Sequence, residues 1–165
     1  MNDNRKIGVL FVCLGNICRS PMAEAVFRDL VAREQLERHF LIDSAGTGNW
    51  HVGKPPHHGT RLILDRYSIS YEGLRARQVA ADDFDKFDYI VAMDNRNEQD
   101  LKVLAREADA KIIKLLDLVP DAVLKEVPDP YYTGNFDETY ELVGKGCRAL
   151  LERIRQDHPA IDKTA

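Results

Sequence analysis

The amino-acid sequence predicts an α/β fold: a four-stranded, doubly wound parallel sheet in three layers, with helices on both faces. Short apolar segments of strand length alternate along the chain with longer segments whose apolar residues recur at helical spacing. No Ser/Gly-rich or strongly charged linker divides the 165 residues, a length typical of one domain. We therefore predict a single domain over residues 1–165, with its core at about residues 6–157.

The first predicted strand, residues 7–12, is apolar throughout except for Gly8, as expected of a central parallel strand that is covered on both faces. Ser20 and Pro21 are typical of a helix start. The residues after them place apolar side chains at helical spacing, namely Ala23, Val26, Phe27, Leu30 and Val31. A strand that runs almost directly into a helix leaves only a short loop between them.

The remaining elements follow the same alternation. We expect strands at residues 40–42, 89–93 and 111–116, the last nearer an edge because of its lysines, and helices through residues 62–64, 95–105 and 136–155. The final helix carries Cys147 on its apolar face, so that cysteine should lie in the core. Gly144 and Gly146 weaken this helix, and nothing in the sequence explains them.

The loop between the first strand and the first helix has the features of an anion site. Its backbone N–H groups lack intrahelical partners and converge with the positive end of the helix dipole. Gly15 and Asn16 readily take the positive φ angles that such a concave loop needs. The guanidinium of Arg19 matches two oxygens of a tetrahedral anion. We predict phosphate binding by the loop residues Leu14, Gly15, Asn16, Ile17 and Cys18, with Cys13 beneath the anion.

Cys13 in this position should already be ionised at neutral pH. Lowering the ionisation midpoint of a thiol by about three pH units takes roughly 4 to 5 kcal/mol. A helix N-terminus supplies only about 0.3 to 2 kcal/mol of this. The loop N–H groups, the Ser20 hydroxyl and Arg19 must therefore act together on the sulfur, which makes Cys13 a candidate nucleophile.

The string from Cys13 to Glu24, CLGNICRSPMAE, resembles the signature loop of the low molecular weight protein tyrosine phosphatases, which share their fold with thioredoxin-linked arsenate reductases. A second match, Asp129-Pro130-Tyr131-Tyr132, lies late in the chain, and the likeness extends from Ile7 to about Arg155. The resemblance implies the phosphotyrosine protein phosphatase I-like fold.

The resemblance also implies a reaction. Cys13 would attack phosphorus while Asp129 protonates the leaving phenol, giving a phosphocysteine enzyme that Asp129 and a water then hydrolyse. Arg19 and the loop N–H groups would hold the phosphoryl oxygens, and Ser20 would ease the departure of sulfur. The substrates would be phosphotyrosyl proteins or peptides and the product inorganic phosphate. This chemistry needs no metal and no cofactor.

Three aromatic residues are assigned to the cleft by the same resemblance. Trp50 lies in a Gly-, Pro- and His-rich loop, where a tryptophan either covers core or is exposed for recognition. The family places an aromatic residue here on the rim of the site, and Tyr131 and Tyr132 would flank a cleft deep enough for a phenyl phosphate. The nearby His51, His57 and His58 lack metal-ligand spacing, so we expect them to be solvated or to cap a helix.

Two further residues are expected to support the loop. In the family, the serine that matches Ser44 bonds the loop asparagine, here Asn16, although on its own Ser44 indicates only a turn at a strand end. Asp94 is well placed to cap a helix, and the resemblance adds a supporting role near the active site. Many members also bond this asparagine through a histidine, but Leu74 stands there, so either Ser44 alone holds Asn16 or another group substitutes.

Alternatives remain at this stage. Arsenate reduction on the same fold needs further cysteines to relay a disulfide, and residues 74–93 have none, although a glutathione-dependent reductase could do without them. A silent phosphotyrosine-binding module would usually have lost Cys13 or Asp129. Cys18 either captures an oxidised Cys13 as a reversible disulfide or is a small buried filler. A structural zinc site lacks a second Cys or His pair.

Charge and composition narrow the partners. The net charge is −4 and no Lys/Arg stripe is visible, which argues against nucleic acid and anionic membranes as partners. Residues 1–6 are not followed by an apolar run long enough for a signal peptide, and no membrane span is visible. We expect a cytoplasmic protein that is a monomer or a weak dimer.

Overall fold

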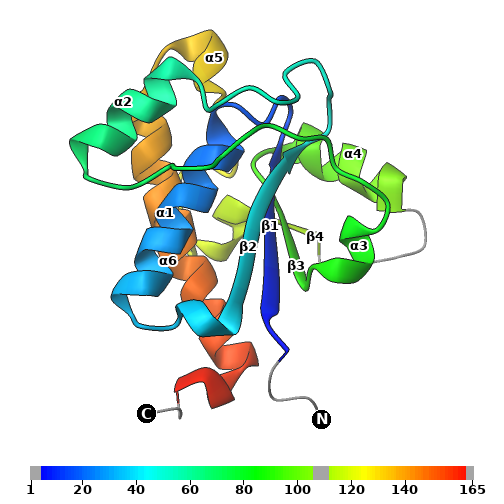
Figure 1. Ribbon diagram of the computed structural model, residues 1–165, viewed down its shortest axis with the longest axis vertical. Coiled ribbons are helices and arrows are strands. Elements are labelled where there is room, and N and C mark those ends of the chain that lie inside the picture. Colours follow the sequence, from blue (N-terminus) through cyan, green and yellow to red (C-terminus); the bar gives the residue numbers. More distant parts are fainter. Residues whose placement is uncertain (1–4, 106–111, 163–165) are drawn as a thin grey trace.

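A computed structural model describes residues 5–105 and 112–162, and its centre is a four-stranded sheet (Figure 1). The strands lie in the order β2-β1-β3-β4, and every neighbouring pair is parallel. Their bounds are β1 Ile7–Cys13, β2 Phe40–Gly46, β3 Tyr89–Ala92 and β4 Ile112–Lys114. The strand order reverses beside β1, which is the switch point where open α/β sheets bind ligands at the carboxyl ends of the strands.

Helices cover both faces of this sheet, so the predicted three-layer, doubly wound fold is confirmed. In Figure 1, α1, α2 and α6 lie on one side of the strands, and α3 and α4 lie on the other. The helices are α1 Arg19–Arg33, α2 His58–Arg66, α3 Asp83–Lys86, α4 Asn95–Ala105, α5 Pro130–Thr133 and α6 Phe136–Asp157. Short 3-10 turns follow at Glu37–His39, Leu115–Leu118 and Pro159–Asp162.

The side chains of β1 alternate between two apolar layers because successive residues of a strand point to opposite faces. Phe11 belongs to the larger layer with Phe27 of α1 and Leu150 of α6. Leu10 belongs to the smaller layer, which includes Leu101 of α4. All five side chains are fully buried. β1 is therefore anchored on both faces, and this fixes the position of Cys13 at its end.

The second strand is longer than predicted. Residues 43–46, interpreted as a turn after the strand, continue β2, because Cys13 pairs with Gly46 in the same register as the rest of β1. Gly46 also forms an isolated bridge with Gln78. The segment that follows α2 is thus attached to the sheet directly beside the end of β1.

The fourth strand is shorter than predicted. Lys111 lies outside the described residues, and residues 115–118 form a 3-10 turn rather than strand. Leu115 and Leu116 are buried, and this turn packs on α6. The predicted edge position is confirmed because β4 pairs with β3 alone in the described sheet.

The packing of α6 explains one of its two unexpected glycines. A Cβ atom on Gly146 would lie 2.3 Å from Cγ of Leu115, so α6 can approach the 3-10 turn this closely only with glycine there. Gly144 would meet only the guanidinium of Arg148, at 3.4 Å, and nothing in the structure explains it. Cys147 is fully buried, as predicted.

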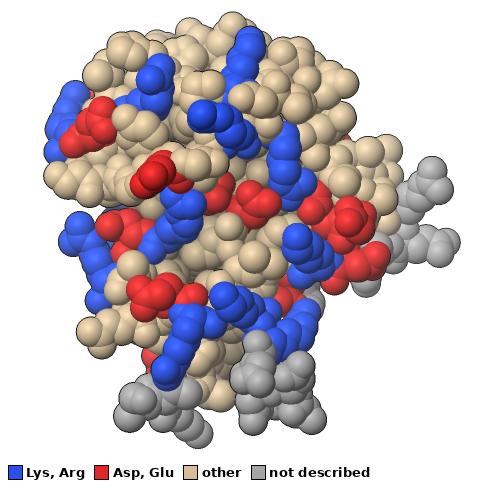
Figure 2. Space-filling model, viewed as in Figure 1, with Lys and Arg blue, Asp and Glu red and all other residues tan. Residues whose placement is uncertain are grey.

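The surface in the view of Figure 2 carries basic and acidic side chains in close alternation. Among the described residues, no helix is both long and apolar enough to cross a membrane. The expectation that residues 1–6 do not begin a signal peptide falls partly on residues 1–4, which lie outside the described part of the chain.

Candidate active site

The loop from Leu14 to Cys18 lies at the carboxyl end of the central strand, between β1 and α1. Asn16 has a φ of 57°, in the left-handed region that the sequence predicted for this position. The same expectation for Gly15 is wrong, because its φ is not positive. Neighbouring segments fasten the loop through its carbonyl groups: Gly48 donates its N–H to Leu14, and His57 donates to Ile17 at 2.7 Å. With the carbonyls used in this way, the loop is held as a rigid turn.

Cys13 is surrounded by the first turn of α1. Its side chain is buried, with Sγ 3.0 Å from the hydroxyl of Ser20. The backbone N–H of Ser20 also donates to this sulfur, at 3.5 Å. The hydroxyl and the backbone N–H of one residue at a helix N-terminus therefore both contact the candidate nucleophile.

Arg19 is buried to 2% exposure and its guanidinium is fixed by three acceptors. Nη1 donates to the Asp94 carboxylate at 2.7 Å and to the Val127 carbonyl at 2.8 Å, and Nη2 lies 3.5 Å from Asp129. Burial alone would lower the pKa of Arg19, but the negative charges of Cys13, Asp94 and Asp129 outweigh it and raise the pKa. Arg19 is therefore a permanently charged group held beside both the nucleophile and the candidate acid.

Asp94 performs both functions considered for it. One carboxylate oxygen holds Arg19, and the other accepts the N–H of Asn97 at 2.8 Å in the first turn of α4. The Asp94 side chain thus both caps α4 and holds Arg19 in place. Asp129 has a similar double use, since Oδ1 caps α5 by accepting the N–H of Tyr131 while Oδ2 faces Arg19.

A pocket of about 200 Å³ opens above Cys13. It brings together most of the predicted site residues, and its lining consists of Cys13, Leu14, Gly15, Ile17, Cys18, Trp50, His51, Asp129, Tyr131 and Tyr132. Trp50 is 59% exposed and Tyr132 76%, so these rings stand on the rim rather than covering core. The predicted site residues Asn16, Arg19, Ser20, Ser44 and Asp94 are not part of this lining; they contact one another or the lining residues from behind.

Asn16 is held by more than Ser44. Its side-chain amide donates to the hydroxyls of Ser20 at 2.7 Å and Ser44 at 3.0 Å, the second being the hydrogen bond that the family resemblance implies. Its oxygen accepts the backbone N–H of Arg77 at 3.0 Å. Leu74 is buried in the larger apolar layer. The position of the missing histidine is thus used for packing, and the backbone of Arg77 provides a bond to the asparagine.

Cys18 is buried beside the nucleophile, and all three cysteines are free thiols. Burial, followed by the charges of Cys13 and Asp129, raises the pKa of Cys18 to about 12. Cys18 is therefore a neutral thiol at physiological pH. The reversible disulfide between the two stays a prediction. In the described part of the chain, no group of three His, Cys, Asp or Glu side chains is placed to hold a metal ion.

The sequence and the structure both match a known family of proteins. The sequence model of the low molecular weight phosphotyrosine protein phosphatase family matches residues 8–160. The chain belongs to this family. It is 56% identical over 152 residues to the low molecular weight protein-tyrosine-phosphatase YfkJ of Bacillus subtilis, covering 92% of this chain and 97% of that protein.

Solved structures agree with this family membership. The crystal structure of YfkJ from Bacillus subtilis matches with a TM-score of 0.92 at 53% identity, covering 95% of this phosphatase and 99% of that chain. The crystal structure of a Drosophila arginine phosphatase matches with a TM-score of 0.82 at 34% identity, covering 89% and 97% of the two chains. The predicted family and enzyme class are confirmed, and the matches do not indicate arsenate reductase.

Sequence reasoning missed three residues of this phosphatase site. His51 lines the pocket beside Trp50, whereas it was expected to be a solvated or capping residue. Glu24 bonds Ser44, and Arg77 bonds Asn16, both over long sequence separations. The motif string contains Glu24 but does not reveal its partner. His57 fits its expected capping role, since its ring accepts the N–H of Gly59 at the start of α2.

Proposed function

We propose that this phosphatase hydrolyses phosphotyrosyl proteins and peptides through a phosphocysteine intermediate. The observation that carries the proposal is the convergence of three groups on one pocket: the Cys13 sulfur, the Arg19 guanidinium and the Asp129 carboxyl. A thiol held by helix N-terminal donors supplies a nucleophile, and the arginine supplies the charge that a phosphoryl group needs.

The first step transfers the phosphoryl group to sulfur. Cys13 Sγ attacks phosphorus in line, the bond from phosphorus to the phenolic oxygen breaks, and the Asp129 carboxyl gives its proton to that oxygen. Arg19 and the loop N–H groups hold the equatorial oxygens, where charge accumulates in a loose transition state. The buried contacts of Arg19 to Asp94 and Val127 support this role, because they keep the guanidinium in place before substrate arrives.

The second step regenerates the enzyme. The Asp129 carboxylate takes a proton from a water whose oxygen attacks phosphorus, and the sulfur–phosphorus bond breaks to release inorganic phosphate. The Ser20 hydroxyl keeps its proton and donates a hydrogen bond to the departing thiolate, a role supported by the 3.0 Å contact between the two atoms. No step uses a metal or a cofactor.

The rim supports a phenyl ester as the preferred substrate. Trp50, Tyr131 and Tyr132 are exposed and surround the opening, where aromatic faces can flank a phenyl ring. A phosphoserine side chain is shorter and would bring its phosphorus to Cys13 only by pulling the peptide backbone into the cleft.

The experiment that tests the proposal is rapid acid quenching during turnover of a phosphotyrosyl peptide, followed by peptide mass spectrometry. We expect phosphate on Cys13 in the wild type, none in Cys13→Ser, and turnover about 10²- to 10⁴-fold lower in Asp129→Ala. The Asp129→Ala defect should shrink on an aryl phosphate with a good leaving group. Phosphate trapped on another residue, or full activity of Cys13→Ser, contradicts the mechanism. Faster turnover of a phosphoarginine peptide contradicts the substrate class.

We also propose a single-domain enzyme that acts as a monomer or weak dimer in the cytoplasm, with phosphoproteins rather than nucleic acid or membranes as partners. The three free thiols support a reducing compartment. Sedimentation at several concentrations tests the oligomeric state, and a dimer stable at nanomolar concentration would contradict it.

A further inference from the structure

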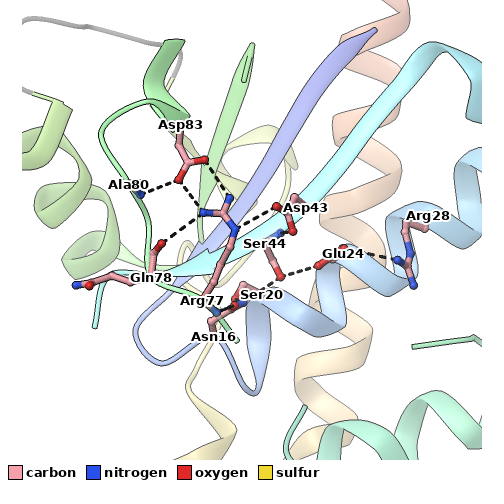
Figure 3. A network of polar contacts seen from close by, with 10 residues as sticks. All are labelled: Asn16, Ser20, Glu24, Arg28, Asp43, Ser44, Arg77, Gln78, Ala80 and Asp83. Carbon is pink, nitrogen blue, oxygen red and sulfur yellow. Dashed lines mark hydrogen bonds and ion pairs between the residues drawn. The ribbon is translucent and has the colours of Figure 1, made fainter. Parts of the chain in front are cut away.

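We propose that Glu24 is a positioning residue of the phosphatase reaction, the terminal acceptor of a directional hydrogen-bond chain that begins at Cys13. The chain runs from Cys13 through Ser20, Asn16 and Ser44 to Glu24, and Figure 3 shows these side chains from Ser20 onward, converging from the loop, α1 and β2. The kinetic part of this inference rests on the proposed function, whereas the reactivity of the Cys13 thiol tests it independently.

The direction of the chain is set at its centre by Arg77. A backbone N–H can only donate, so the Arg77 N–H at 3.0 Å identifies the facing atom of Asn16 as its carbonyl oxygen. The amide nitrogen of Asn16 must then face Ser20 and Ser44, and its two hydrogens go one to each hydroxyl. The Asn16 side chain has no freedom to flip.

Both serine hydroxyls are therefore acceptors toward Asn16, and each must turn its own hydrogen elsewhere. For Ser20 the partner is Cys13 Sγ at 3.0 Å. For Ser44 the partner is Glu24 Oε1 at 2.7 Å, which makes Ser44 the donor in that bond. The Glu24 carboxyl at one end thus supports the direction that Arg77 sets, in which the Ser20 hydroxyl hydrogen points at Cys13 at the other end.

Arg77 itself is fastened on two sides. Its guanidinium lies 3.1 Å from Asp43 in the middle of β2 and makes two bonds, of 2.9 and 3.0 Å, to the buried carboxylate of Asp83. Its carbonyl accepts the N–H of Gly46 at 2.8 Å. The Arg77 N–H that orients Asn16 therefore belongs to a backbone segment that is held in place. Glu24 holds the hydrogen-bond chain at its other end.

The surroundings of Glu24 indicate a role other than an ion pair. The residue is 5% exposed, and the charged groups that face it are Arg28 on α1, Asp43 on β2 and Arg77 in the segment after α2. Arg28 lies 3.7 Å away, beyond the distance of a short charge-assisted bond. Burial, with a smaller contribution from Asp43, raises the pKa of Glu24 to about 7 despite the Ser44 hydrogen bond. The shortest contact of this buried carboxyl is with Ser44, which is linked to Cys13 through Asn16 and Ser20. Such a placement is typical of a residue that supports an active site.

Loss of this acceptor should reach the nucleophile through Asn16. Without Glu24 the Ser44 hydrogen lacks its acceptor in the chain, and Ser44 no longer presents a fixed lone pair to the asparagine. Asn16 sits at a φ of 57°, which asparagine adopts readily, so its side-chain hydrogen bonds are what fix the direction of its amide group. A less constrained Asn16 lets the Ser20 hydroxyl rotate away from Cys13, so the thiolate loses a donor.

The test compares Glu24→Gln with Glu24→Met. Both side chains are neutral, unbranched and similar in size, and only glutamine offers a strong acceptor to the Ser44 hydrogen, so the pair separates hydrogen bonding from charge. Asp29→Asn on the exposed part of α1 is the control for losing an acid from this helix. The readouts are the pH midpoint of Cys13 alkylation by iodoacetamide, localised by peptide mass spectrometry, and kcat and KM on a phosphotyrosyl peptide.

We expect the Cys13 alkylation midpoint of Glu24→Met to lie about one pH unit above that of Glu24→Gln, and its kcat to be about tenfold lower with KM within threefold. Ser44→Ala should resemble Glu24→Met, and the double variant should be no worse than either single one. Asp29→Asn should match the wild type. Circular dichroism spectra identify any variant that fails to fold, in which case Ser44→Ala against the wild type decides.

Equal alkylation midpoints and equal kcat in Glu24→Gln and Glu24→Met overturn the inference, as does additivity of the Glu24→Met and Ser44→Ala effects. If no protein hydrolyses phosphotyrosyl peptide but the alkylation midpoints still separate, the proposed function fails and the positioning role of Glu24 stands. If the wild type hydrolyses the peptide and the midpoints coincide, the function stands and Glu24 has no positioning role.

Discussion

At the scale of single residues, the buried carboxyl of Glu24 makes the free energy of unfolding depend on pH. The pKa of Glu24 rises from an ordinary 4.5 to about 7, chiefly through burial. Below pH 4.5 the carboxyl is protonated in both the folded and unfolded states. Between the two values only the unfolded chain ionises, so the stability contributed by the protonated form is lost as the pH rises through about 7.

Glu24→Gln removes this titration, because the amide does not ionise. We expect the unfolding free energy of the variant, relative to the wild type, to increase by about 3 kcal/mol between pH 4.5 and pH 8. Urea denaturation of both proteins at these two pH values measures the change. Asp29→Asn, with its exposed ion pair, should show no comparable trend. A relative stability that stays constant with pH would mean that Glu24 is ionised in the folded protein throughout this range.

The site residues found from the sequence lie in local motifs, whereas those missed act through contacts between distant parts of the chain. Cys13 and Arg19 stand at a fixed spacing in one loop, and Asp129 lies in a Pro-flanked string of its own, so local patterns reveal them. Arg77 contacts Asn16 across 61 positions through its backbone N–H, which all residue types except proline possess. The contact of Glu24 with Ser44 needs the register of α1 on β2, which only the folded chain provides.

At the scale of elements, strands and helices were predicted well where burial alone determines them. β1, α1 and α6 carry clear apolar patterns, and the structure places β1, α6 and the start of α1 within one or two residues of the predicted bounds. Boundaries set by tertiary contacts were missed. β2 continues to Gly46 because β1 pairs with it as far as Cys13, and β4 stops at Lys114 because the following leucines turn into the core under α6.

The two glycines of α6 give opposite expectations for the same substitution. Gly146→Ala places a methyl group against the Leu115 side chain and should destabilise the protein by about 1 to 3 kcal/mol. Gly144→Ala meets only a flexible arginine end and should stabilise it by about 0.5 to 1 kcal/mol through helix propensity. Thermal or urea unfolding of both variants measures the difference. Equal effects of the two substitutions would show that Leu115 moves aside without cost.

At the scale of the whole molecule, the apolar layers on the two faces of the sheet both contain side chains of β1. Because neither layer can open without disturbing this strand, we expect the chain to unfold as one unit. Cys147 is fully buried on α6, against the backbone of α1, so its thiol reacts only when this packing opens. In a Cys13→Ser, Cys18→Ser background, the urea midpoint for Cys147 labelling should coincide with the midpoint from far-ultraviolet circular dichroism. Labelling at clearly lower urea would separate α6 from the rest of the fold and contradict a single cooperative domain.

The only tryptophan of the chain, Trp50, stands on the rim of the pocket and is more than half exposed. Indole emission is sensitive to its surroundings, so the fluorescence of the unlabelled protein reports events at the mouth of the cleft rather than in the interior. Occupancy by phosphate or by an unreactive aryl phosphonate can therefore be followed by titration without attaching a dye.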